Sequence, residues 1–212
     1  MSLTRLHITL CFLICLSGSA SLSGQAWNFV REQNGIKLYT RQEEGTRIKA
    51  CKGMEDLDVP AEKVFELIEN VNNTDWWDKG LSQIKILHYE KNKKAQYYLV
   101  YDLPWPISDR DLCTDVTVTS DAATGEHKIT AAPLQGVVPE KDNMIRIKNF
   151  HQTWTITRLD KDKTHIALEG FIDPGGKIPD WLFNMLIVES PFRSLKSVAD
   201  RLGGGPSVKK LP

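Results

Sequence analysis

Alternating apolar and polar residues dominate the chain between residues 82 and 172. Successive side chains of a strand point to opposite faces, so each alternating run predicts a strand with one buried and one wetter face. The connections between the runs are short, which favours antiparallel neighbours. With two earlier runs we expect about eight strands, at residues 35–41, 46–58, 83–91, 95–103, 111–119, 126–132, 145–159 and 165–172.

The strand expected at 46–58 shows how the faces are assigned. Its apolar positions Ile48, Ala50 and Met54 alternate with a second set, Arg47, Lys49, Cys51 and Glu55. This alternation predicts that the first set is buried and that the second set, including Glu55, lies on the wetter face.

Two stretches have helical spacing. Pro60 starts the first, which runs to about residue 72, because proline is well tolerated in the first turn of a helix. The second runs from about residue 178 to residue 202 and ends at the glycines that begin with Gly203. Strands followed by one long helix indicate an α+β architecture, with a curved antiparallel sheet wrapped around that helix.

The two halves of the final helix differ in polarity. Its second half has a single apolar stripe, whereas its first half, with Leu182, Met185 and Leu186, is apolar on nearly every side. A helix packed on one sheet face needs only one apolar side. The additional apolar surface therefore requires another partner, which is a loop, the interior of a cavity, a membrane or a second subunit.

A stiff corner separates the strands 95–103 and 111–119. Two prolines flank Trp105 and cannot donate to a sheet ladder, so the chain leaves the sheet there and returns near Arg110. We expect Trp105 to plug the end of the barrel, with Arg110 and Asp111 tying the corner by charge-assisted hydrogen bonds. The alternative is a direct ligand role.

A tryptophan pair, Trp76-Trp77, follows the first predicted helix. An indole combines an apolar body with a polar N–H group. The pair is therefore expected either to pack the helix onto the sheet or to form a ligand gate or membrane-interface patch.

The first 26 residues have a different character from the rest. A basic start at Arg5, a short apolar run at 8–16 and small residues through Ala20 are typical of a secretory signal peptide. We expect cleavage after Ala20 or Ala26 and an exported, periplasmic or secreted, protein. An uncleaved anchor or a buried helix is the alternative.

Charge and cysteine content narrow the function further. Loss of the leader removes Arg5 alone among the charged residues, so the 27 basic and 27 acidic side chains stay nearly balanced. Nucleic-acid binding is therefore not expected, because it requires a basic surface. Cys51 and Cys113 are far apart in sequence, and we expect two buried free thiols rather than a bridge.

Motifs for catalysis are missing from the sequence. The histidines have no metal-ligand spacing, and no nucleophile elbow, P-loop or dinucleotide fingerprint occurs, so we expect no metal and no cofactor. Glu189 is predicted near the apolar side of the last helix, where it would have a raised pKa or a cationic partner such as Arg110. Either residue could orient a polar ligand group or be structural.

The corner residues Pro104-Trp-Pro-x-Ser-x-Arg-Asp111 resemble the signature of START domains, the lipid-transfer domains related to the steroidogenic acute regulatory protein, in the Bet v 1-like helix-grip superfamily. The segments 35–41, 59–65 and 176–183 resemble the family's first strand, its following helix and the start of its last helix. Trp27 and the residues after it resemble a short entry helix. The resemblance covers about residues 27–202, and together with the predicted signal peptide it leads us to expect an exported, bacterial member of the family.

This resemblance implies a carrier with an apolar tunnel between the sheet and the last helix. We expect Tyr97, Leu99 and Tyr101, or the opposite parity of that strand, to line the tunnel, with Leu182, Met185 and Leu186 as its lid. Arg110 and Glu189 are the candidate polar ligand contacts. Sterol-carrying members have an acid–arginine pair, and the matching positions near Tyr97/Tyr98 and Val116 cannot form one, which argues against a sterol.

We therefore expect three parts: a signal peptide at 1–26, a START-like domain at 27–205 and a flexible tail at 206–212. The expected function is an exported, monomeric module that binds or transports a lipid or another hydrophobic small molecule, with transient membrane contact. Two alternatives stay open: a polyketide-cyclase-like enzyme on the same fold, and a module that docks onto a protein through the apolar start of the last helix.

Overall fold

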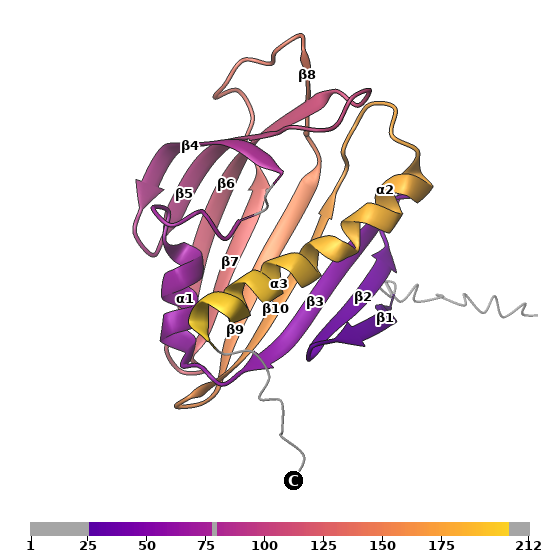
Figure 1. The fold of residues 1–212 in the computed structure, drawn as a ribbon. Helices are drawn as coiled ribbons and strands as arrows, with labels where there is room; N and C mark the ends of the chain where they lie inside the picture. Colours follow the sequence, from indigo (N-terminus) through magenta and orange to yellow (C-terminus); the bar gives the residue numbers. More distant parts are fainter. Residues whose placement is uncertain (1–25, 78–79, 204–212) are drawn as a thin grey trace, which may run out of the picture.

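The computed structural model describes residues 26–77 and 80–203 (Figure 1). Most of the predicted leader and the whole predicted tail lie outside these residues. The described chain forms one ten-stranded sheet. Its strands are β1 (Asn28–Gln33), β2 (Ile36–Gln42), β3 (Lys49–Leu57), β4 (Leu81–Glu90), β5 (Lys94–Tyr101), β6 (Asp109–Asp121), β7 (Glu126–Pro133), β8 (Met144–Arg146), β9 (Phe150–Asp160) and β10 (Lys163–Ile172).

Three helices accompany the sheet, namely α1 (Ala61–Glu69), α2 (Asp180–Ile187) and α3 (Glu189–Leu202). The strand order is β1-β2-β3-β10-β9-β7-β6-β5-β4, with β8 paired to β6. Helix α3 runs across one face of this curved sheet, and α1 packs beside it (Figure 1). We call the face covered by α1 and α3 the inner face. The expected α+β helix-grip architecture is confirmed.

The main core lies between the inner face and the helices. Its most deeply buried side chains come from β2, β3, β9, β10, α1 and α3, and they include Leu38, Leu57, Ile156, Ile166, Leu168, Val64, Leu195 and Val198. These strand residues occupy alternate positions, as a half-buried sheet requires. A second cluster on the inner face joins β5 and β6 to the start of β9.

The first element differs from the expected short helix, because residues 28–33 form strand β1, paired antiparallel with β2. Asn34 and Gly35 make the connection, and both have positive φ, 54° and 81°. An Asn-Gly pair favours the tight hairpin turn that needs such angles. The hairpin signal was therefore present in the sequence, and the entry-helix prediction was wrong.

The strand expected at 145–159 is two strands. β7 ends at Pro133, opposite Thr114, so the first part of β6 has no β7 partner. β8 fills that position and pairs in parallel with residues 109–111 of β6. The chain then crosses to β9, which pairs with β7 and β10.

The expected continuous last helix is also divided, with α2 ending at Ile187 and α3 starting at Glu189. The cause is Pro191, which has no N–H to donate to the carbonyl of Ile187, and whose ring crowds that carbonyl. Proline is acceptable in the first turn of α3 but not inside one long helix. The sequence therefore contained the signal for two helices.

Candidate functional site

Strand β5 presents its odd-numbered side chains to the inner face. Tyr97 and Leu99 are buried there with Leu112 and Phe150, and Tyr101 packs against the same cluster. The opposite parity, represented by Tyr98, lies on the other face beneath the 134–144 segment. The sequence left open which alternate set of β5 side chains faces the helices. The structure shows that this set is Tyr97, Leu99 and Tyr101.

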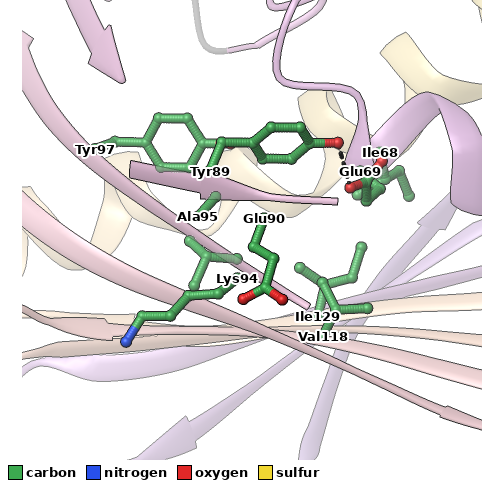
Figure 2. Close-up of a pocket in the computed structure, with 10 residues that line it drawn as sticks. Ile68, Glu69, Tyr89, Glu90, Lys94, Ala95, Tyr97, Val118 and Ile129 are labelled. Carbon is green, nitrogen blue, oxygen red and sulfur yellow. Dashed lines mark hydrogen bonds between the residues drawn. The ribbon is translucent and has the colours of Figure 1, made fainter. Parts of the chain in front are cut away.

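A small cavity opens on this inner face beneath the end of α1 (Figure 2). Its volume is about 20 Å³, which accommodates one water-sized group. The lining is mostly apolar and comes from α1 and from strands β4 to β7, with Ile68, Glu69, Tyr89, Glu90, Lys94, Ala95, Tyr97, Val116, Val118 and Ile129. A lipid does not fit this cavity, because ligand pockets usually measure roughly 300–1,000 Å³.

A hydrogen bond closes one side of the cavity. The Tyr89 hydroxyl donates to Glu69 Oε1 at 2.7 Å (Figure 2), and the Asn92 backbone N–H donates to the same oxygen at 2.8 Å. Partial burial, together with the Glu69 carboxylate, raises the pKa of Tyr89 to about 12, so this hydroxyl stays protonated at neutral pH. The bond fastens the end of α1 to the β4–β5 hairpin.

Helix α2 stands at the other end of the inner face with none of its residues buried. Trp181, Met185 and Leu186 are 70%, 57% and 54% exposed, although their side chains are apolar. The helix is held on one side by Asn184, whose Oδ1 accepts from the Lys49 N–H at 2.8 Å. Asn184 Nδ2 also donates to a backbone carbonyl at 2.9 Å, that of residue 47.

Arg110 anchors the loop that leads into α2. The side chain is 2% exposed, and its Nε and Nη2 donate to the carbonyls of Pro174 and Gly175, both at 3.2 Å. Its Nη1 donates to the carbonyl of Ser108. Burial lowers the pKa of Arg110, and the nearby Asp109 partly offsets this effect. Every nitrogen of the Arg110 guanidinium group thus donates to a backbone carbonyl.

Asp111 points to the opposite face and belongs to a buried ion pair. Its two carboxylate oxygens accept from Arg146 Nε at 2.7 Å and Nη2 at 2.9 Å, and the Tyr98 hydroxyl donates to Oδ2 at 3.0 Å. These hydrogen bonds outweigh the effect of burial and lower the pKa of Asp111. The prediction that Arg110 and Asp111 tie the corner is consistent with these contacts.

A family model described as the START domain matches residues 15–202. The chain belongs to the START family. An uncharacterised protein of Pseudomonas aeruginosa is 28% identical over 174 residues, covering 81% of this chain and 84% of that protein. Phosphatidylcholine transfer protein of Rattus norvegicus is 26% identical over 172 residues, covering 77% and 78%.

Solved structures agree with the family assignment. The crystal structure of a STAR-related lipid transfer protein from Xanthomonas axonopodis has a TM-score of 0.74 and 26% identity, over 84% of this chain and 98% of that one. Human StAR-related lipid transfer protein 5 has a TM-score of 0.73 at 17% identity, which shows a shared fold.

Trp105 in this START domain does not plug the barrel, because 93% of its side chain is exposed. The corner projects from the sheet instead of folding over its end. Trp76 and Trp77 pack against the sheet, which is one of the two alternatives expected from the sequence. Trp76 meets Trp154 edge to face with ring centroids 6.1 Å apart, and the Trp77 ring centroid lies 5.3 Å from that of Tyr97.

Glu189 and Arg110, two candidate polar ligand contacts, are not partners in the START domain. Glu189 Oε2 accepts from Arg31 Nη2 of β1 at 2.5 Å, and Arg31 also lies over the Phe192 ring, 5.1 Å from its centroid. Of the two alternatives expected for Glu189, a raised pKa or a cationic partner, the structure shows a cationic partner, which is Arg31 and not Arg110. Arg31 was not considered as a partner because the segment after Trp27 was expected to be a helix, not strand β1.

The face assigned to β3 was also wrong at Glu55, which is 4% exposed on the inner face and not on the wetter face. Ile48 and Ala50 form a separate cluster with Phe171, against which Phe183 of α2 packs. Both sides of β3 are therefore covered along parts of its length. Sequence alternation alone could not reveal this.

Cysteines and possible metal ligands add no further site in the described part of the chain. Cys51 and Cys113 are buried free thiols, as expected, and burial raises the pKa of Cys51 to about 12. Over residues 26–77 and 80–203, no three His, Cys, Asp or Glu side chains gather as metal ligands.

Proposed function

We propose that this START domain is an exported carrier that holds a lipid or another hydrophobic small molecule between the inner face of its sheet and helices α2 and α3. Relatives named as lipid transfer proteins, including phosphatidylcholine transfer protein, support a lipid ligand. The observation that carries the proposal is α2, an eight-residue helix of sequence DWLFNMLI with no buried residue. Such a helix gains a partner when a hydrophobic ligand covers it.

In this proposal, Leu182, Met185 and Leu186 act as a lid over the inner face that carries Tyr97 and Leu99. Burial of apolar area contributes about 25 cal/mol per Å², so a long hydrocarbon ligand needs no specific contact to its head group to bind. The cavity under α1 has a volume of only about 20 Å³. Ligand uptake therefore requires α2, or α2 together with α3, to move away from the sheet.

The same end of the molecule is proposed to touch membranes transiently. Trp105 and Trp181 are 93% and 70% exposed, and an indole suits the boundary between lipid head groups and hydrocarbon. Arg110 links the strand that follows Trp105 to the loop that precedes α2. No helix in the described segments combines the length and the apolar character needed to cross a bilayer. We propose a monomer that visits the bilayer surface.

The test uses the full chain, expressed and purified with whatever processing occurs, and native mass spectrometry before and after organic extraction. We expect one lipid adduct per chain that disappears on extraction. The mass of the exported form would also distinguish cleavage after Ala20 from cleavage after Ala26.

Two variants make this test specific. Leu186→Arg should abolish the adduct, because it places a charge on the proposed lid. Leu159→Arg is the matched control, since Leu159 is 51% exposed near the end of β9, against 54% for Leu186. A protein that carries no adduct and takes up none from phosphatidylcholine and phosphatidylethanolamine vesicles would refute the carrier proposal.

A further inference from the structure

Glu55 is an acidic side chain in the core with no partner. It lies on β3, is 4% exposed, and neither carboxylate oxygen has a hydrogen-bond partner among residues 26–77 and 80–203. A buried polar group without a hydrogen bond costs free energy, and a buried charge without a partner costs much more. The side chain is not part of the small cavity under α1 or of the proposed lid.

The element that covers Glu55 is α3. Gly53, two residues earlier on the same face, lies directly under this helix: a Cβ on Gly53 would be 2.6 Å from Leu195 Cδ1 and 2.9 Å from Pro191 Cβ. Further along, the charge of Asp200 on α3 acts on Glu55. The carboxyl group therefore lies at the contact between β3 and α3.

The other neighbours of Glu55 described below do not stabilise a charged carboxylate at this position. Ile166 is its register partner on β10, and Ile36 of β2 is buried on the same face. The charged groups that act on it are the carboxylates of Asp200 on α3 and Asp56 on β3 itself. Each of these acids has its own partner, since Lys196 pairs with Asp200 and the His165 ring lies 2.6 Å from Asp56 Oδ1.

Burial first, and then Asp200 and Asp56, raise the pKa of Glu55 to about 7. While α3 covers it, the carboxyl group is therefore neutral in mildly acidic solution. If α3 leaves the sheet, water reaches the carboxyl group and its pKa returns to the usual value near 4.5. The open state thus holds the proton less tightly than the closed state.

We propose that the separation of α3 from β3 is coupled to the release of a proton from Glu55, so that rising pH loosens the helix. The sign follows from linkage, because the state that binds fewer protons gains population as pH rises. The equilibrium constant for opening is expected to increase between about pH 4.5 and pH 7 and then to level off, with a total change of about 300-fold.

The consequence for ligand exchange rests on the proposed carrier function. A ligand held between the inner face and α3 would be retained in acidic solution and exchanged faster near neutral pH. The opening of α3 itself requires no ligand and can be measured on lipid-free protein, so its failure and the failure of the carrier proposal are distinguishable.

Hydrogen exchange of the α3 amides in lipid-free protein, from pH 5 to pH 8 and corrected for intrinsic exchange, tests the coupling. In the wild type, the opening constant of residues 195–202 should rise by about two orders of magnitude across this range. Glu55→Gln should remove most of the dependence on pH. Glu66→Gln is the control, because it removes the same charge from an exposed position on α1 and should leave the dependence intact.

A second measurement keeps the proposal testable if Glu55→Gln does not fold. Carboxyl ¹³C NMR of the wild type should show Glu55 titrating near pH 7, and Asp200→Asn should move that midpoint to lower pH. A Glu55 midpoint near 4.5, or α3 exchange that does not change with pH after correction, would overturn the proposal.

Discussion

The distance between the last helix and the sheet is set at Gly53. With no side chain at this position, Leu195 and Pro191 approach the β3 backbone directly, and α3 settles into the concave inner face. Both α3 side chains are buried, so the helix cannot shift without exposing apolar surface. The absence of a Cβ at Gly53 thus sets how closely α3 approaches β3.

Gly53→Ala should therefore push α3 away from the sheet. The new methyl group would lie 2.6 Å from Leu195 Cδ1, so we expect the free energy of unfolding to fall by about 1–3 kcal/mol, as for other overpacked cores. Urea denaturation measures this change. In the Leu195→Ala background the same substitution should cost less, and a double-mutant cycle with no coupling energy would contradict the steric explanation.

At the scale of elements, the division of the last helix gives its two parts different roles. α3 has four buried residues and closes the core, whereas α2 has none and is joined to it through Val188. Pro191 causes the division because it cannot donate to the Ile187 carbonyl. A weakly attached α2 beside a more firmly packed α3 is what the proposed lid requires.

Pro191→Ala should join α2 and α3 into one straighter helix. Alanine keeps the Cβ that faces Gly53 but restores the missing N–H group, so the substitution tests the helix break more than the packing. We expect slower hydrogen exchange over residues 186–192 and slower lipid uptake from vesicles. Unchanged exchange in this segment would mean that Pro191 does not cause the break.

At the scale of the whole molecule, the two most exposed aromatic side chains among the described residues, Trp105 and Trp181, lie on the Trp-Pro corner and on α2. Arg110 connects these two regions through backbone carbonyls of the loop before α2. The opposite end, with the β9–β10 turn and the close of α3, exposes mainly charged residues such as Lys161 and Asp162. This difference in polarity is the basis of the proposal that the end with Trp105 and Trp181 contacts a bilayer surface.

Replacing both Trp105 and Trp181 with alanine should weaken binding to vesicles. If each indole buries about 60 Å² in the interface, it contributes about 1.5 kcal/mol, so losing both should reduce partitioning roughly a hundredfold. Co-sedimentation with phosphatidylcholine vesicles measures the change. Leu159→Ala is the control at the other end, and equal loss in that variant would argue against a membrane-facing end.

The comparison between sequence and structure separates local from distant causes. The strands of the middle region and the α+β class follow from alternation, which left the parity of Tyr97 open, and the corner motif pointed to the START family. The Asn34-Gly35 hairpin and the Pro191 break were also readable from local sequence. Burial of Glu55 was not, because it depends on α3 meeting β3 at Gly53, a contact between residues far apart in the chain.

The candidate site was predicted less completely than the fold. The exposure of Trp105 depends on the direction in which a corner leaves the sheet, which no local pattern encodes. The partner of Glu189 is 158 residues away, on a strand that was expected to be a helix. Polar contacts of this kind are fixed by topology, so errors in one element propagate to its partners.

The absence of buried residues on α2 has a consequence for speed. Lifting α2 uncovers less apolar surface than lifting α3, because α2 has no buried residue whereas α3 buries Leu195 and Val198, so the hydrophobic effect opposes the first motion less than the second. Motions of weakly held helices and loops take place in nanoseconds to milliseconds, and the detachment of a core element is far slower. Detachment of α2 should therefore be fast and detachment of α3 slow. In the proposed carrier, the slower motion of α3 would set the residence time of a bound ligand.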